Sequence, residues 1–212
     1  MTWYDFTNFI LLLCCIIVII RKYAIISGET KILLVYFVLT FFLEALSLVY
    51  ILKGTNNLFL YHIIVPFQFL LLAYYLLSLI GKKRSKLMLS FLILAAVVMW
   101  CFSLYFISLS KYYSVAGVLK NLILCGLALS FYQNAYGTFS DSSKFSSFHT
   151  WVCTGIFITS LGNFSIEGSM NYLLDNDRDI ATAFYYLHIG WEFLFYVIFI
   201  LAFLLTKPKD QR

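Results

Sequence analysis

The sequence predicts an all-α membrane protein, a bundle of seven transmembrane helices in a single domain. Of its 212 residues, 62% are hydrophobic and only 12% are charged, about half the charged share of a soluble domain. The apolar residues form runs as long as a helix needs to cross a bilayer. These runs lack the alternation of membrane β-strands, and backbone groups in lipid need partners within their own segment, so each run is expected to be helical.

Seven apolar segments follow one another along residues 1–212 and leave no stretch long enough for a soluble domain. They cover residues 3–20, 32–52, 57–80, 87–109, 112–134, 148–168 and 181–206. Pro66 is the only proline inside a segment, and we expect it to bend the third helix. The first segment contains Asp5, lacks a basic start and precedes no small-residue cleavage site. We therefore expect it to be retained rather than removed as a signal peptide.

The distribution of Lys and Arg predicts the orientation, because basic loops stay in the cytoplasm. Basic residues follow the first, third and seventh segments: Arg21, Lys22, Lys31, Lys82, Lys83, Arg84, Lys86, Lys207, Lys209 and Arg212. The opposite side carries Lys53, Lys111 and a mostly acidic stretch at 175–179. This predicts a multi-pass protein of the cytoplasmic (inner) membrane, with its N-terminus outside and its C-terminus inside. The net charge of +5 does not indicate nucleic-acid binding, since no continuous basic face forms.

The third and seventh segments share a short pattern. Residues 67–70 read Phe-Gln-Phe-Leu and residues 191–194 read Trp-Glu-Phe-Leu, and a His-Ile pair precedes each at offsets that differ by two residues. Both segments run from outside to inside in the predicted orientation, as a parallel three-plus-one-plus-three repeat requires. Chance similarity between two helices rich in Phe and Leu explains the same pattern, so both interpretations stay open.

Polar residues within the spans form the candidate site. They come from five segments and lie in the outer half of the predicted bundle, with Gln68 near mid-depth, whereas the inner half is almost purely apolar. The set is Glu44, His62, Gln68, Lys120, Asn121, Asn163, His188 and Glu192. Isolated ionisable groups are costly in lipid. We therefore expect these side chains to converge on one outward-opening pocket that binds a small polar ligand or protons.

His188 and Glu192 are the most informative pair in this set. Their spacing of four residues puts both on one helix face, and Tyr185 and Tyr196 extend the same stripe. Lys120 is expected to offset the charge of Glu44 or Glu192.

Hydrogen bonding between helices, without any ligand, is the alternative role for such residues, at roughly 1 kcal/mol for each bond. We favour it for Gln68, Asn121 and Asn163. Asn163 shares its predicted helix face with Thr159 and Glu167 at spacings of four residues.

No cofactor is predicted. Only His62 and His188 fall in the predicted pocket, so the three-histidine metal site of seven-helix intramembrane hydrolases is absent. Retinal would need a lysine in the last segment, and residues 181–206 contain none.

The Tyr-His-Ile opening of the third segment at residues 61–63, together with Glu44, Asn163 and His188, resembles a family of uncharacterised bacterial seven-helix inner-membrane proteins. That family has an acidic residue after this opening, where the chain has Gln68. The resemblance implies a seven-helix architecture and an inner-membrane location, and it carries no known activity.

Three function classes fit these features. The leading hypothesis is a non-enzymatic binding or sensing protein that signals to a partner through the loops at 82–86 or 135–147, since no soluble output domain is present. A small-solute or proton-coupled transporter would agree with the internal repeat. An intramembrane lipid-modifying hydrolase could use Glu44 and Glu192 as acid and base, with His62 and His188 beside them.

Overall fold

A computed structural model of the chain describes residues 3–23, 26–80, 89–98, 101, 105, 112, 114–137 and 147–205. The described residues form helices and no strand, which confirms the all-α class. The six long helices are α1 (Trp3–Lys22), α2 (Gly28–Leu52), α3 (Leu58–Ile80), α5 (Ser114–Gly137), α6 (Ser147–Asn176) and α7 (Arg178–Leu205). A shorter apolar helix covers Leu89–Val98, and most of the remaining predicted segment 87–109 lies outside the described residues.

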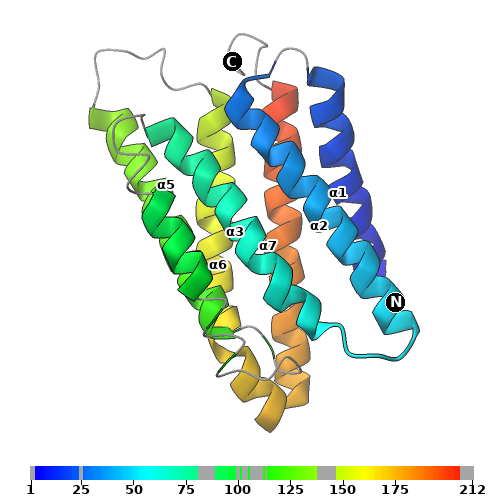
Figure 1. The fold of residues 1–212 in the computed structure, drawn as a ribbon. Helices are drawn as coiled ribbons and strands as arrows, with labels where there is room; N and C mark the ends of the chain where they lie inside the picture. The colour runs from blue at the N-terminus through cyan, green and yellow to red at the C-terminus, as the bar shows by residue number, and fades with distance from the viewer. Residues whose placement is uncertain are drawn as a thin grey trace.

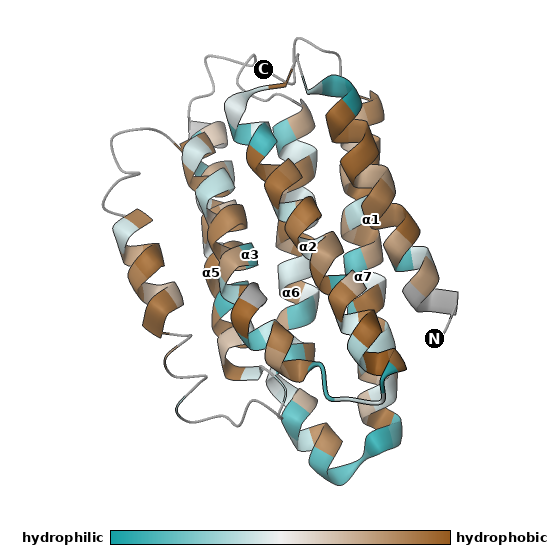
Figure 2. Cartoon of the chain, turned by 45° about the vertical axis from the view of Figure 1, so that its right-hand side comes forward, coloured by the Kyte–Doolittle hydropathy of each residue, from teal (hydrophilic) through white to brown (hydrophobic). Residues whose placement is uncertain are grey.

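Four of these helices are long and apolar enough to cross a membrane: Gly28–Leu52, Leu58–Ile80, Ser114–Ala135 and Arg178–Leu205. Large apolar side chains also face outward, among them Phe42 at 66% and Phe91 at 68% exposure. A soluble protein rarely leaves so much apolar surface in water. Figure 2 shows mostly hydrophobic residues along the helices and hydrophilic residues at their ends. The fold is that of a membrane protein, while the seven spans and their orientation stay predictions.

Several predicted boundaries differ from the structure: α2 begins at Gly28 rather than at residue 32, and two further differences lie at the turn between α6 and α7. The sixth segment, predicted to end at residue 168, continues as α6 to Asn176, because the polar residues beyond the apolar run remain compatible with a helix. The seventh begins at Arg178 rather than at residue 181. Asp177 explains this start, since its Oδ1 accepts hydrogen bonds from the backbone N–H groups of Asp179 and Ile180 at 3.1 Å and so caps α7.

The six long helices pack as a closed ring in chain order (Figure 1). Each contacts the helix before and after it, and α7 closes the ring against α1. The connection at 53–57 and the turn at Asp177 lie at the same end of the ring, which Figure 1 draws at the bottom and which we call the lower end. Helix α3 runs unbroken through Pro66, and the predicted bend stays a prediction.

Aromatic side chains fill the interior between the ring helices. Phe37, Phe148, Phe199 and Phe203 are fully buried, with ring centroids 4.5 Å apart for Phe37 and Phe199 and 4.6 Å apart for Phe148 and Phe203. The inner face of α7 therefore packs against both α2 and α6. Gly162 of α6 allows this close approach, because a Cβ there would lie 2.4 Å from the ring of Trp191.

Candidate functional site

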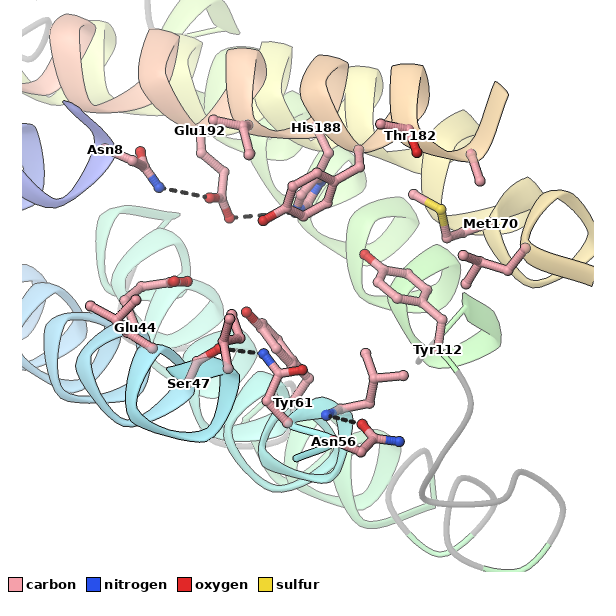
Figure 3. Close-up of a pocket in the computed structure, with 18 of the residues that line it drawn as sticks. Asn8, Glu44, Ser47, Asn56, Tyr61, Tyr112, Met170, Thr182, His188 and Glu192 are labelled. Atoms are coloured by element: carbon pink, nitrogen blue, oxygen red, sulfur yellow. Dashed lines mark hydrogen bonds and ion pairs between the residues drawn. The ribbon is translucent and has the colours of Figure 1, made fainter. Parts of the chain in front are cut away.

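A pocket of about 590 Å³ lies between the helices at the lower end (Figure 3). Its lining comes from α1, α2, α3, α6 and α7, from the connection between α2 and α3, and from Tyr112, which precedes α5. The polar lining residues are Asn8, Glu44, Ser47, Asn56, Asn57, Tyr61, Tyr112, Thr182, Tyr185, His188 and Glu192. This volume suits a small organic ligand, and the mixture of apolar walls with a few polar groups is typical of binding sites.

His188 and Glu192 form the α7 wall of the pocket. His188 Nε2 lies 3.6 Å from Glu192 Oε1, and His188 Nδ1 lies 3.0 Å from Asn163 Oδ1. Asn8 Nδ2 donates to Glu192 Oε2 at 3.4 Å, so α1, α6 and α7 meet at this pair. In the tautomer with hydrogen on Nδ1, His188 donates to Asn163 and turns Nε2 toward Glu192.

Glu44, Ser47 and Tyr61 form the opposite wall. Figure 3 shows Glu44 of α2 across the pocket from Glu192 of α7. Asn57 Nδ2 donates to Ser47 Oγ at 2.5 Å, which ties the start of α3 to α2. Two carboxylates therefore face one cavity from different helices.

Three of the eight predicted site residues line this pocket: Glu44, His188 and Glu192. Asn163 is buried behind them and reaches the pocket through its hydrogen bond to His188. Of the predicted stripe on α7, Tyr185 lines the same wall as His188 and Glu192, whereas Tyr196 is buried and does not line the pocket.

His62 and Gln68 of α3 do not line the pocket, contrary to the prediction. His62 is fully buried, and its neighbour Tyr61 takes the position facing the cavity, because successive helical residues point about 100° apart. Gln68 Nε2 donates to Thr40 Oγ1 at 2.8 Å. Gln68 therefore joins α2 to α3, the hydrogen-bonding role that the sequence favoured.

Lys120 and Asn121 do not line the pocket and belong to a separate polar cluster, in which Asn121 has the role of hydrogen bonding between helices that the sequence favoured. Lys120 Nζ lies 3.1 Å from Glu167 Oε1, and Asn121 Nδ2 donates to Glu167 Oε2 at 2.8 Å. The ion pair of Lys120 is thus with Glu167, not with the expected Glu44 or Glu192. The ring order explains this, because α5 packs directly on α6. We call Lys120, Asn121 and Glu167 the Glu167 cluster.

Tyr112 is a pocket residue that the sequence did not single out. Asn171 holds its backbone, since Asn171 Oδ1 accepts from the Tyr112 N–H at 3.0 Å and Asn171 Nδ2 donates to its carbonyl at 2.9 Å. The phenol of Tyr112 lines the pocket and can donate a hydrogen bond.

Asn8, Asn56 and Asn57 were also missed. Asn8 follows Asp5 and Thr7 at the start of the first segment, and this polar start was the available signal for it, whereas the other two precede α3 in a connection that carries no periodic pattern.

Four buried aromatic residues lie deeper in the bundle than the pocket-lining Glu44 and Glu192, and we call Phe37, Phe195, Tyr196 and Phe199 the aromatic floor. All four are buried, and ring centroids lie 6.0 Å apart for Phe37 and Phe195 and for Phe37 and Tyr196. Phe199 is seven residues beyond Glu192, about two helical turns deeper. The floor therefore separates the pocket from the upper end of the bundle.

Comparisons of the chain with protein-family models, curated proteins and solved structures found no match. The resemblance to uncharacterised seven-helix inner-membrane proteins stays a prediction. Within the described residues, no group of three or more His, Cys, Asp or Glu side chains is placed to hold a metal ion.

Proposed function

We propose that this chain is an integral membrane protein that binds a small ligand in the lower-end pocket and signals to a partner protein. The observation that carries the proposal is the facing of Glu44 and Glu192 across a cavity of about 590 Å³. Buried ionisable groups in a membrane bundle are costly, and such groups commonly mark a functional site.

The Glu167 cluster provides an internal comparison. Glu167 serves helix packing, and its two oxygens are taken up by Lys120 and Asn121 at 3.1 and 2.8 Å. Glu44 and Glu192 instead line open volume large enough for a ligand. The same residue type thus occupies two kinds of environment in one bundle, and only one of them has room for another molecule.

Helix α7 gives binding a route to the other end of the protein. It supplies Thr182, Tyr185, His188 and Glu192 to the pocket and continues as one helix to Leu205. At the upper end, Lys22 Nζ donates to the carbonyl of Phe203 at 2.5 Å. A ligand that shifts α7 would therefore also move its contact with α1, next to the loops that we predict to face the cytoplasm.

A ligand screen on the purified full-length protein in lipid nanodiscs tests the proposal. We expect a small-molecule library to contain compounds that raise the melting temperature, with smaller shifts in Glu44→Gln and Glu192→Gln. Asp175→Asn is the matched control, because this exposed carboxylate lies at the same end outside the lining. Absence of any stabilising compound, or shifts that the pocket variants leave unchanged, would overturn the binding function.

Two further assays separate the remaining function classes. Flux of a stabilising compound into proteoliposomes would instead indicate a transporter. Turnover of lipids with a bell-shaped pH profile would indicate a hydrolase. The packed aromatic floor favours a binding protein over a transporter, because it lies across the path from the pocket to the upper end of the bundle.

A further inference from the structure

Resting on the proposed binding function, we infer that the ligand is a small amphipathic organic cation: an amine whose ammonium group lies between Glu44 and Glu192. The charge of the lining favours a cation. Among the described residues that line the pocket there are two carboxylates, one histidine and no Lys or Arg. Lys120 is engaged by Glu167 at 3.1 Å. The lining therefore carries a formal charge of −2 with neutral His188 and −1 with protonated His188, and surroundings of low polarity favour a neutralising cation.

Asn8 orients one of the two carboxylates. This residue is only 8% exposed and lines the pocket. Its Nδ2 donates to Glu192, while its buried Oδ1 has no hydrogen-bond partner among the described residues. Glu44 and Glu192 therefore offer carboxylate acceptors to the cavity, and an ammonium group brings three N–H donors and no acceptor.

The rest of the lining fits an apolar body attached to the charge. Tyr61, Tyr112 and Tyr185 surround the cavity, and aromatic rings attract organic cations. Figure 3 places Met170 and Tyr112 at the opposite end of the pocket from Asn8 and Glu44. We therefore place the ammonium group innermost and the apolar body toward the lower end.

The dimensions favour an organic amine over a bare metal ion. Thr182 and Glu192 both line the pocket, and ten residues of helix separate them by about 15 Å. A cavity of about 590 Å³ lies in the range of sites for small organic molecules, whereas a metal ion needs several ligand atoms drawn close around it.

Three probes of matched shape test this inference: 2-phenylethylamine, 2-phenylethanol and 3-phenylpropionate. Each is added to the full-length protein in nanodiscs of zwitterionic lipid, and the melting temperature and dissociation constant are measured. We expect only the amine to stabilise the protein. Its affinity should fall about 10- to 100-fold in Glu44→Gln and Glu192→Gln, the loss expected for a hydrogen bond to a charged group, and stay unchanged in Asp175→Asn.

A second pair of variants protects the test if a pocket glutamate proves necessary for folding. Tyr185→Leu should weaken amine binding, whereas Tyr172→Leu, at an exposed position outside the lining, should not. Stronger stabilisation by the alcohol or the carboxylate, lost in the pocket variants, would overturn the cation inference and leave the binding function standing. Stabilisation by none of the three would also overturn the inference, while the library screen decides the binding function separately.

Discussion

Gly117 of α5 lies against the carboxylate of Glu167 on α6, so closely that a Cβ at position 117 would stand 2.0 Å from Oε2. Lys120 and Asn121 hold the same carboxylate from α5. Glu167 therefore cannot move aside without losing a hydrogen bond or an ion pair in a buried setting. The missing side chain at position 117 is what lets this carboxylate lie between the two helices.

Gly117→Ala should therefore lower the free energy of unfolding by about 1–3 kcal/mol, the usual cost of overpacking a filled interior. Gly126→Ala is the control on the same helix, because a Cβ there meets nothing within 4 Å. Alanine is the better helix former, so this control should be neutral or stabilising by up to about 1 kcal/mol. Unfolding in mild detergent measures the stability of both variants. Equal stability would show that the Glu167 side chain can adopt another conformation at no cost.

Lys120→Met should destabilise the protein by about 3 kcal/mol, because it leaves the buried charge of Glu167 without its partner. Glu167→Gln should cost less, since the Lys120 side chain is 17% exposed against 5% for Glu167 and its long stem can carry the charge to more polar surroundings.

A double-mutant cycle checks the coupling. The variant that combines Lys120→Met with Glu167→Gln should be more stable than the sum of the single losses predicts, because it removes both charges together. Strict additivity would mean that the pair contributes no energy through its contact.

The class of fold and the pocket's central residues could be predicted because both follow from local patterns. Long apolar runs predict membrane helices without any tertiary information. His188 and Glu192 share a helix face through their spacing alone. Exposing the Glu44 carboxylate to lipid would be costly, which predicts that it faces the interior of the bundle.

The partner of Lys120 could not be predicted, because depth in the membrane does not say which helices are neighbours. Glu44, Glu192 and Glu167 all lie at suitable depths, and only the ring order, with α5 against α6, selects Glu167. The position of His62 could not be predicted for a different reason. It lies at the depth of the pocket, but one residue of helical rotation gives the cavity-facing position to Tyr61.

Phe199→Ala should destabilise the protein by about 3–5 kcal/mol, because it leaves a cavity in the aromatic floor. The ring is 0% exposed and packs 4.5 Å from Phe37 and 5.0 Å from Phe203, measured between centroids. Phe193→Ala on the same helix is the matched control. Phe193 is 39% exposed, so its loss should cost much less. Similar losses in the two variants, measured by unfolding in detergent, would argue against a packed floor.

Thiol labelling decides which way the pocket faces. Thr55→Cys lies in the exposed connection at the lower end, and Tyr23→Cys is 47% exposed after α1 at the other end. Both variants leave every Lys and Arg in place, so the charges that determine orientation are unchanged. They are made after the five native cysteines have been replaced by serine or alanine.

In intact cells, a membrane-impermeant maleimide should label the introduced thiol at position 55 and leave position 23 unlabelled until the cells are opened. This follows from the predicted orientation, in which the basic clusters stay in the cytoplasm. Labelling at position 23 alone would show that the bundle has the opposite orientation in the membrane. The pocket would then face the cytoplasm, and the ligand would have to be an intracellular amine, because the aromatic floor closes the path from outside.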